Sequence, residues 1–499
     1  MRYFFFPLLF SIFLLLGACS KDAKVKSKDY PYLLTGPVTD ITDQSVNFNC
    51  EVLGTGNYTN LECGFLWDSI EPFNATANKI VASSGAGIGS YTKTVDYSLV
   101  PGRELYVRAY LLTDNLMVYG NTRHFTCNGG KPASIESFSP AKGYVNTAVT
   151  ISGQNFGRQT DKIRVFFGTT PAVVDSVTGN RIYTRVPEIN QDIECLIRVE
   201  SAGKQSQSVT TFRAFTYWKR IAFMPGEFRY GAVSFILGDT AYVGMGLKPD
   251  GTALNDFWAY EALSNTWTRK PDFPGTARGM AAGFSDGIMG FAGFGIVNQK
   301  YLTDLWMFNP QRNTWARTAD LPGILSYGDA CFEINGKAYF VNQNSFLVYT
   351  IYGSFDPQGI FPGDYRHLTA GFSSADKGYL FAGRTPGNVY MKDLWEYTPA
   401  FGSWKKLSEL PGKKYRDSPV GFCLNSRLFM GLGRYGSALN DFYEYVPATD
   451  EWKLLESFPG GGRVSAVAFT LGSKAYIGTG SNNGSGAYSD FYEFDPFKQ

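Results

Sequence analysis

Short runs in which apolar residues dominate or alternate with polar ones follow one another from about residue 30 to the end of the chain. Clusters of Gly, Pro, Asn and Asp separate them, as is typical of strands joined by turns, whereas a helix would space its apolar residues three and four positions apart. In the N-terminal part the runs are Val46–Val52, Cys63–Trp67, Ser90–Val95, Leu105–Leu111 and Val118–Cys127. The pattern predicts an all-β protein, and 499 residues are enough for several domains.

The C-terminal half repeats one such pattern, marked by an aromatic residue and a Pro seven positions after it. The pairs are Trp218 and Pro225, Trp267 and Pro274, Trp315 and Pro322, Phe355 and Pro362, Trp404 and Pro411, and Trp452 and Pro459. In the second copy, four apolar runs cover Gly279–Phe284, Ile288–Gly295, Asp304–Phe308 and Thr314–Arg317. Four short strands in a repeat of 48 or 49 residues are typical of one blade of a β-propeller.

Two further motifs recur in most copies. Paired glycines such as Gly293 and Gly295 end the second run, and an Asp followed by aromatic residues opens the third, as in Asp441–Tyr445 (DFYEY). Together with the late Trp, these motifs resemble kelch repeats, and the resemblance implies a six-bladed kelch propeller over residues 217–499. The last copy stops without its Trp strand, so we expect the strand at residues 217–221 to complete that blade and close the ring.

The N-terminus carries a targeting pattern. Residues 1–18 begin Met-Arg and are then mostly apolar, over a stretch shorter than the ~20 residues of a membrane span, which predicts a signal peptide. The sequence Leu16-Gly17-Ala18-Cys19 resembles the bacterial lipobox, which implies cleavage before Cys19 and lipidation of its sulfur. Residues 19–29 then form a charged tether. Ser20, directly after the Cys, resembles the residue found there in lipoproteins sorted to the outer membrane. Whether the protein faces the periplasm or the cell surface is left open.

Two sandwich domains are expected between the tether and the repeats. Over residues 30–128, the stretch Leu99–Tyr110 resembles a fibronectin type III-like domain, with Tyr106 in the place of the tyrosine corner. Over residues 132–216, the motifs IESFSP, VTISGQNFG and VFFG resemble an IPT/TIG domain, which implies a second Ig-like sandwich. The expected architecture is therefore two Ig-like β-sandwiches, acting as a stalk, followed by the propeller.

Charge and cysteine content narrow the classes of function. The formal net charge is +2 and no long basic run is present, so nucleic acid is not an expected partner. The seven Cys show no CxxC spacing, which argues against a zinc or redox framework. Cys50 and Cys63 lie on successive predicted strands, and either pair in an oxidising compartment or remain buried thiols.

No metal or cofactor is expected. Some kelch propellers are copper oxidases, whose site needs two His together with tyrosines around the metal. This chain has two His in all, and only His367 lies in the repeats, since His124 belongs to the first sandwich. The chain therefore lacks the ligands for copper oxidation.

Arginines recur where the topology predicts one shared face. In an antiparallel blade, the start of strand one, the end of strand two and the start of strand three lie on the same side. The candidate ligand-binding arginines at the start of strand one are Arg229, Arg278, Arg366, Arg416 and Arg463. Those at the end of strand two are Arg384 and Arg434. Crowded guanidinium groups suit bidentate capture of carboxylate, sulfate or phosphate. Alternatively, such arginines bond blade-to-blade carbonyls as part of the framework, where we also expect the repeat Asp and Trp.

The third repeat departs from the pattern. It is short between strands two and three and lacks the Asp, which removes a loop from the arginine face. The missing loop predicts a groove beside the axis, and decay of an unconstrained repeat is the alternative. The residues expected to line the groove are Tyr327, Gln343, Asn344, Tyr365 and Arg366.

These features predict a lipid-anchored envelope protein that binds a glycan or a protein on its arginine-rich face, and the arginines fit an acidic ligand. On that interpretation, replacing Arg366 and Arg416 by Ala abolishes binding and leaves the melting temperature nearly unchanged.

Two alternatives are a scaffold subunit of an outer-membrane complex and an enzyme, because some six-bladed bacterial kelch propellers are sialic-acid mutarotases. The enzyme would need a carboxylate-holding arginine, Arg366 or Arg416, and a proton-transfer group. The candidates for that group are Asp364, Asp417 and His367.

Overall fold

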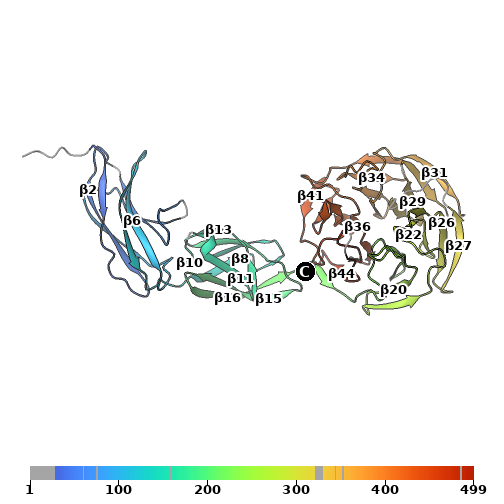
Figure 1. Ribbon diagram of the computed structural model, residues 1–499, viewed down its shortest axis with the longest axis horizontal. Coiled ribbons are helices and arrows are strands. Elements are labelled where there is room, and N and C mark those ends of the chain that lie inside the picture. The colour runs from blue at the N-terminus through green and yellow to red at the C-terminus, as the bar shows by residue number, and fades with distance from the viewer. Residues whose placement is uncertain are drawn as a thin grey trace, which may run out of the picture.

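The computed structural model describes residues 29–498, apart from positions 60, 75–76, 158, 321–329, 343, 351–352 and 484–485. The expected signal peptide, Cys19, Tyr327 and Gln343 lie outside the described residues. Within them the chain is all-β, and its one helical turn is the 3₁₀ turn η1 (Thr160–Lys162). Two sandwiches and a ring of sheets follow one another in a row, with the second sandwich in the middle (Figure 1).

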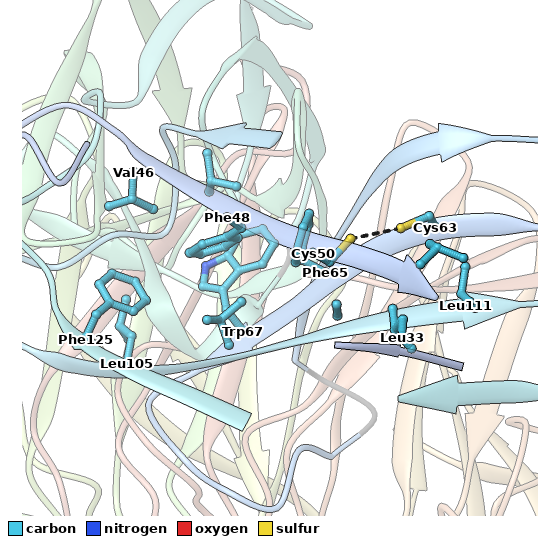
Figure 2. Close-up of a cluster of buried hydrophobic side chains, with 14 of the residues drawn as sticks. Leu33, Val46, Phe48, Cys50, Cys63, Phe65, Trp67, Leu105, Leu111 and Phe125 are labelled. Carbon is cyan, nitrogen blue, oxygen red and sulfur yellow. Dashed lines mark hydrogen bonds between the residues drawn. The ribbon is translucent and has the colours of Figure 1, made fainter. Parts of the chain in front are cut away.

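The first sandwich packs a three-stranded sheet, in the order β1-β2-β5, on a four-stranded sheet, in the order β4-β3-β6-β7. The strands are β1 (Tyr32–Thr35), β2 (Val46–Gly54), β3 (Glu62–Asp68), β4 (Asn78–Ser84), β5 (Gly89–Val95), β6 (Glu104–Leu112) and β7 (Met117–Thr126). Alternate residues of β2 and β3 point inward, so that Phe48, Phe65 and Trp67 meet between the sheets (Figure 2). The Sγ atoms of Cys50 and Cys63 lie 3.3 Å apart in this core as unbonded thiols.

Tyr106 does not occupy a tyrosine corner. In β6 the residues Leu105 and Val107 face the core, so the strand's alternation turns Tyr106 outward, where it is half-buried beside His124. The fully buried tyrosine of β6 is Tyr110, whose hydroxyl donates to Glu62 at 2.7 Å.

The second sandwich packs the sheet β13-β14-β10-β8 on the sheet β12-β11-β15-β16-β9. Its strands are β8 (Ser134–Ser139), β9 (Lys142–Tyr144), β10 (Ala148–Gln154), β11 (Ile163–Phe167), β12 (Thr170–Ala172), β13 (Val174–Thr178), β14 (Arg181–Arg185), β15 (Ile193–Ser201) and β16 (Lys204–Phe215). Apolar residues of both sheets, among them Ile151, Phe167 and Phe212, form its core. The amide of Gln159 donates to Asp68 at 3.0 Å and so links it to the first sandwich.

From residue 217 onward the described residues form six four-stranded antiparallel sheets. The first two are β18 (Val233–Leu237), β19 (Thr240–Gly244), β20 (Phe257–Glu261) and β21 (Thr266–Lys270), then β22 (Ala282–Ser285), β23 (Gly290–Gly293), β26 (Asp304–Asn309) and β27 (Thr314–Asp320). The third and fourth are β28 (Ala330–Ile334), β29 (Lys337–Asn342), β30 (Ser345–Tyr349) and β31 (Phe355–Ile360), then β32 (Ala370–Ser373), β33 (Gly378–Phe381), β34 (Leu394–Thr398) and β35 (Ser403–Lys406). The fifth is β36 (Val420–Leu424), β37 (Arg427–Gly431), β40 (Phe442–Val446) and β41 (Glu451–Leu454).

The sixth sheet joins the two ends of this segment. It pairs β42 (Val467–Leu471), β43 (Lys474–Gly478) and β44 (Phe491–Phe494) with β17 (Trp218–Arg220), which is its outer strand. Two hairpins extend from the sheets, β24 (Ile296–Val297) with β25 (Lys300–Tyr301), and β38 (Arg434–Tyr435) with β39 (Ser437–Ala438). The first strand of each sheet contacts the first strand of the next, and β42 contacts β18, so that the six sheets form a closed ring around a central channel (Figure 1).

The repeated aromatic residue fills the space between neighbouring sheets. Trp315 of the second sheet packs on Phe257 of the first, with ring centroids 5.0 Å apart, and its indole N–H donates to the carbonyl of Pro271. In the third sheet Phe355 takes this position and packs against Phe294 of the second sheet. The Trp and its substitute therefore serve as spacers that bury apolar surface between sheets.

A buried carboxyl group joins the ring to the second sandwich. Glu456 accepts hydrogen bonds from the hydroxyl of Thr216 at 2.6 Å and from the backbone N–H of Tyr217 at 2.9 Å. The ring of Tyr217 stacks on that of Tyr144, whose hydroxyl donates to the carbonyl of Lys498 near the chain end. Burial raises the pKa of Glu456 from 4.5 to about 7, although both hydrogen bonds lower it.

This shift predicts a pH-dependent junction. Because the pKa of Glu456 is higher in the folded protein, the stabilisation it contributes is complete below its unfolded pKa and is lost as the pH rises through about 7. Glu456→Gln removes the charge while keeping a carbonyl acceptor for Tyr217. We expect the variant to be more stable than the wild type by about 2 kcal/mol at pH 8 and equally stable near pH 5. Melting temperatures measured from pH 5 to 8 test this, and a difference that does not change with pH would contradict it.

Candidate functional site

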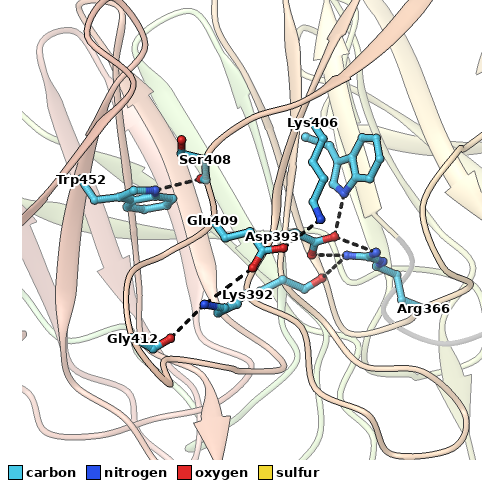
Figure 3. A network of polar contacts seen from close by, with 10 residues as sticks. Arg366, Lys392, Asp393, Lys406, Ser408, Glu409, Gly412 and Trp452 are labelled. Carbon is cyan, nitrogen blue, oxygen red and sulfur yellow. Dashed lines mark hydrogen bonds and ion pairs between the residues drawn. The ribbon is translucent and has the colours of Figure 1, made fainter.

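An arginine–aspartate pair is buried in five of the six sheets. The arginine precedes the innermost strand and the aspartate precedes or opens the third strand of the same sheet, and the arginines are at most 2% exposed. The pairs are Arg229 with Asp256, Arg278 with Asp304, Arg366 with Asp393, Arg416 with Asp441, and Arg463 with Asp490. In the fifth sheet, both Nη atoms of Arg416 lie 2.9 Å from the carboxylate oxygens of Asp441. The bidentate form recurs in Arg366 and Asp393 (Figure 3).

Further bonds hold each pair in place. Arg366 also donates from Nη1 to the carbonyl of Ala382 at the end of the second strand and from Nε to the carbonyl of Asp364. The indole of Trp395 donates to Asp393 at 2.7 Å. These contacts use the guanidinium and the carboxylate on several sides at once.

The pair keeps its carboxylate charged although the group is largely buried. Burial by itself raises the pKa of Asp256, but the hydrogen bonds and charge of Arg229 outweigh it and hold the pKa below its ordinary value. The same balance lowers the pKa of Asp304 beside Arg278. The negative charge of such a largely buried carboxylate therefore depends on its arginine.

This geometry supports the framework interpretation for Arg229, Arg278, Arg366, Arg416 and Arg463. A buried guanidinium that faces a carboxylate of its own sheet presents no surface to a ligand, so we do not retain these five as ligand contacts. The repeat Asp, also expected in the framework, is the partner of the arginine. For the same reason Arg366 and Arg416 are not available to hold the carboxylate of a sugar acid.

Arg384 and Arg434 differ from the other five because they share one carboxylate. Nη2 of Arg434 donates to Oδ2 of Asp417 at 2.8 Å, and Nε of Arg384 lies 3.2 Å from the same oxygen. Asp417 is fully buried, whereas the side chains of Arg384 and Arg434 are 18% and 26% exposed. Among the described residues, Oδ1 of Asp417 has no hydrogen-bond partner. Within the described part of the chain, these two cationic groups share the one carboxylate of Asp417, which leaves an excess positive charge at this point.

Both arginines line a cavity of about 240 Å³ on the side of the ring where the innermost strands begin. Its lining residues are Tyr230, Met280, Leu368, Arg384, Ser418, Arg434, Val464, Ser465, Ser481 and Asn483. Asn483 accepts a hydrogen bond from Nη1 of Arg434 at 3.0 Å. The cavity shares lining residues with a smaller one of about 150 Å³, which in turn shares residues with the central channel, so all three follow the ring axis.

The mouth of this channel is built from backbone. Gly231, Met280, Leu368, Ser418 and Ser465 are equivalent in their sheets, and all have φ between 50° and 62°. The N–H of Met280 donates to the carbonyl of Gly231, that of Gly231 to Ser465, that of Ser465 to Ser418, and that of Ser418 to Leu368. Four consecutive hydrogen bonds therefore connect five sheets around the opening.

His367 and the described groove residues are not part of this cavity lining, although the backbone of His367 pairs with that of Arg384. His367 is 8% exposed, and burial together with the charge of Arg384 lowers its pKa, so that it is neutral at pH 7. Asn344 is exposed and Tyr365 half-buried, while Tyr327 and Gln343 lie outside the described residues, so the groove beside the third sheet stays a prediction.

The sequence pattern did not identify Asp417 as a shared counterion. It also did not identify Asn483 or the serines of the cavity lining as site residues. A signal existed for two lining residues, Tyr230 and Val464, and for Asp417 behind the lining. The position after the repeat arginine, occupied by Tyr230, Asp417 and Val464 in three sheets, points to the channel mouth.

No cluster of three or more His, Cys, Asp or Glu side chains suited to a metal ion occurs in the described part of the chain. Over the same residues, no helix has the length and apolar character needed to span a bilayer.

Comparison with known proteins identifies one domain. Residues 133–214 match the family model described as IPT/TIG domain. This segment is an IPT/TIG domain. It forms the second sandwich, and the resemblance inferred from its motifs is confirmed.

Two known proteins are similar to parts of the chain. The cyclomaltodextrin glucanotransferase of Geobacillus stearothermophilus is 26% identical over 162 residues, which are 32% of this chain and 19% of that enzyme, so the chain spans less than a fifth of the enzyme. The solved structure of YjhT is similar with a TM-score of 0.48 and 17% identity, over 54% of this chain and 95% of that chain.

The buried pairs change the expected result of replacing the repeat arginines. Arg416→Ala leaves Asp441, whose side chain is only 19% exposed, without its bidentate partner, and removal of one member of a buried pair typically costs about 3–5 kcal/mol. We therefore expect a large fall in the melting temperature, where the sequence interpretation expected almost none for the Arg366 and Arg416 double variant.

The control is Arg269→Ala, which breaks the exposed pair with Asp272 and is expected to cost at most about 1 kcal/mol. Denaturant unfolding of the full-length protein, followed by Trp fluorescence, measures both. Equal stability of Arg416→Ala and the wild type would contradict the framework role and make Arg416 a candidate ligand contact again.

Proposed function

We propose that this protein is a lipid-anchored binding protein of the bacterial cell envelope. Its C-terminal ring is a six-bladed kelch-type propeller that binds an acidic glycan at the mouth of the central channel. The observation that carries this proposal is the cavity lined by Arg384 and Arg434, which have Asp417 as their shared counterion. An anionic group placed there neutralises the excess positive charge.

The chemistry of the lining suits a carboxylate attached to a hydroxyl-rich molecule. A guanidinium has five N–H donors in one plane and matches a carboxylate with two parallel hydrogen bonds. Ser418, Ser465 and Ser481 supply small groups that both donate and accept, and Asn483 adds an amide. Convergent polar groups around a small hollow are typical of sites for small ligands or single sugar residues, whereas protein partners usually cover broader surfaces.

The rest of the chain supports capture at a membrane. The lipobox at Cys19 supplies an anchor, and a fibronectin type III-like sandwich followed by the IPT/TIG domain supplies a stalk. The two sandwiches and the ring lie in a row, so the second sandwich lies between the first sandwich and the ring (Figure 1).

Arg434→Gln tests the site because it removes one charge while keeping hydrogen-bonding groups near Asp417 and Asn483. We expect the wild type to bind uronic or sialic acids in preference to neutral sugars, and the variant to bind them at least tenfold more weakly, since a hydrogen bond to a charged group contributes about 1.5–3 kcal/mol. Isothermal titration with each sugar measures this, with Arg269→Gln as a surface control of the same charge change.

Equal binding of neutral and acidic sugars, or no loss in Arg434→Gln, would contradict the site. A wild type that binds no sugar and retains an envelope protein in a pull-down would instead favour a protein partner.

The anchor is tested by Cys19→Ala. This change removes the sulfur that accepts the lipid, so the protein is expected to move from the membrane fraction to the soluble envelope fraction, as seen by fractionation and immunoblotting. Ser20→Ala is the matched control and should stay with the membrane. Unchanged membrane association of Cys19→Ala would refute the lipid anchor.

A further inference from the structure

Three tyrosines gather beside the arginine-lined cavity, and together they form what we name the tyrosine platform: Tyr390, Tyr415 and Tyr435. The ring centroids of Tyr390 and Tyr435 lie 5.4 Å apart at an interplanar angle of 87°, and those of Tyr415 and Tyr435 lie 5.8 Å apart at 43°. They come from three separate loop segments of the fourth and fifth sheets, namely the connection before β34, the segment before Arg416 and the hairpin β38–β39.

These tyrosines do not belong to the core of the ring. The side chain of Tyr435 is 49% exposed and those of Tyr390 and Tyr415 are half-buried, whereas Tyr397 and Tyr445 on the strands of the same sheets are at most 3% exposed. A cluster of partly exposed aromatic rings on loops gives up contact with the apolar interior, and exposed apolar patches are commonly interaction sites.

The platform is continuous with the cavity. Tyr435 directly follows Arg434, and the backbone of Tyr390 pairs with that of Arg384, whose guanidinium lies 6.0 Å from the Tyr390 ring centroid. On the other side, Nζ of Lys392 lies 5.5 Å from the centroid of Tyr415. Aromatic rings thus begin where the cationic wall of the cavity ends, and an ion pair lies at their far edge, because Nζ of Lys392 is 3.6 Å from Glu409.

We propose that the tyrosine platform is a second subsite, and that the natural ligand is an oligosaccharide rather than a single sugar acid. This inference rests on the proposed function, because the carboxylate of one sugar residue occupies the cavity between Arg384 and Arg434. The next sugar residue lies on the platform. The C–H groups on one face of a pyranose are apolar and slightly positive, and they pack on the electron-rich faces of aromatic rings. The tyrosine hydroxyls donate to and accept from the sugar hydroxyls at the edges.

The charge at the cavity end of the platform agrees with this occupant. Arg384 and Arg434 lie at that edge, so an acidic group of the oligosaccharide meets positive charge there, whereas Lys392 at the other edge is already paired with Glu409. A neutral oligosaccharide gains only the stacking contacts.

The test uses the full-length protein, a panel of oligosaccharides with uronic or sialic acid residues, the corresponding acidic monosaccharides, and neutral maltotriose. We expect the wild type to bind an acidic oligosaccharide about tenfold or more tightly than its acidic monosaccharide. Tyr435→Ala should lower the oligosaccharide affinity about tenfold and leave the monosaccharide affinity unchanged. Tyr435→Phe keeps the ring and should retain most of the affinity.

Phe401→Ala is the matched control, because Phe401 is 82% exposed in the turn between β34 and β35, at the opposite end of the sheet from the platform. It should bind like the wild type. Equal affinity for monosaccharide and oligosaccharide, or no effect of Tyr435→Ala, overturns the platform and leaves the arginine cavity standing. Absence of binding to every acidic sugar overturns both, and an acidic peptide that binds through Tyr435 assigns the platform to a protein partner and overturns the glycan subsite.

Discussion

The ring depends on one ionic interaction, the buried arginine–aspartate pair that recurs in five of its sheets. Each arginine ties together three strand ends of one sheet through its side chain. In four of these arginines the backbone carbonyl also accepts a hydrogen bond from a glycine of a neighbouring sheet, as that of Arg416 does from Gly383 at 3.0 Å. No side chain fits at Gly383, where φ is 102° and a Cβ would lie 2.4 Å from Thr369 Cγ2. The pair therefore fixes the shape of a sheet and its distance from the next sheet together.

The third sheet lacks the repeat Asp. Its strands β29 and β30 are separated by residues 343–344, so no loop is present there to carry one. Its core is nonetheless complete, with Phe332, Tyr339 and Phe346 packed together against Trp404 of the fourth sheet. The first sheet, which keeps its ionic pair, packs Phe235 against Trp315 in the same way, so the third sheet retains the apolar packing and lacks only the Asp. The departure is local because the neighbouring pairs, in the second and fourth sheets, are intact.

Much of the strand pattern was predictable because the repeat fixes its own boundaries. The expected run Asp304–Phe308 became β26 almost unchanged, and Thr314–Arg317 became the start of β27. In the first sandwich β4 was missed, since Asn78–Ser84 is mostly half-buried and shows no clear alternation.

The partner of the repeat arginine was harder to find, although the topology contained it. Arg229 and Asp256 are far apart in sequence, and strand direction placed both on one face. Taken without the aspartates, the row of repeat arginines resembles a binding surface. Arg384, Arg434 and Asp417 could not be sorted from the others by sequence, since which arginine meets which carboxylate depends on backbone pairing between sheets.

The four backbone hydrogen bonds that connect five sheets at the channel mouth separate the shape of the opening from its chemistry. The bonds connecting Met280, Gly231, Ser465, Ser418 and Leu368 use only N–H and carbonyl groups, so the opening keeps its dimensions whichever side chains stand there. A thioether, a leucine, two hydroxyls and a bare glycine already share one backbone conformation in this chain. Evolution can therefore exchange the groups presented to a ligand one at a time, and relatives with the same ring can acquire different specificities without rebuilding it.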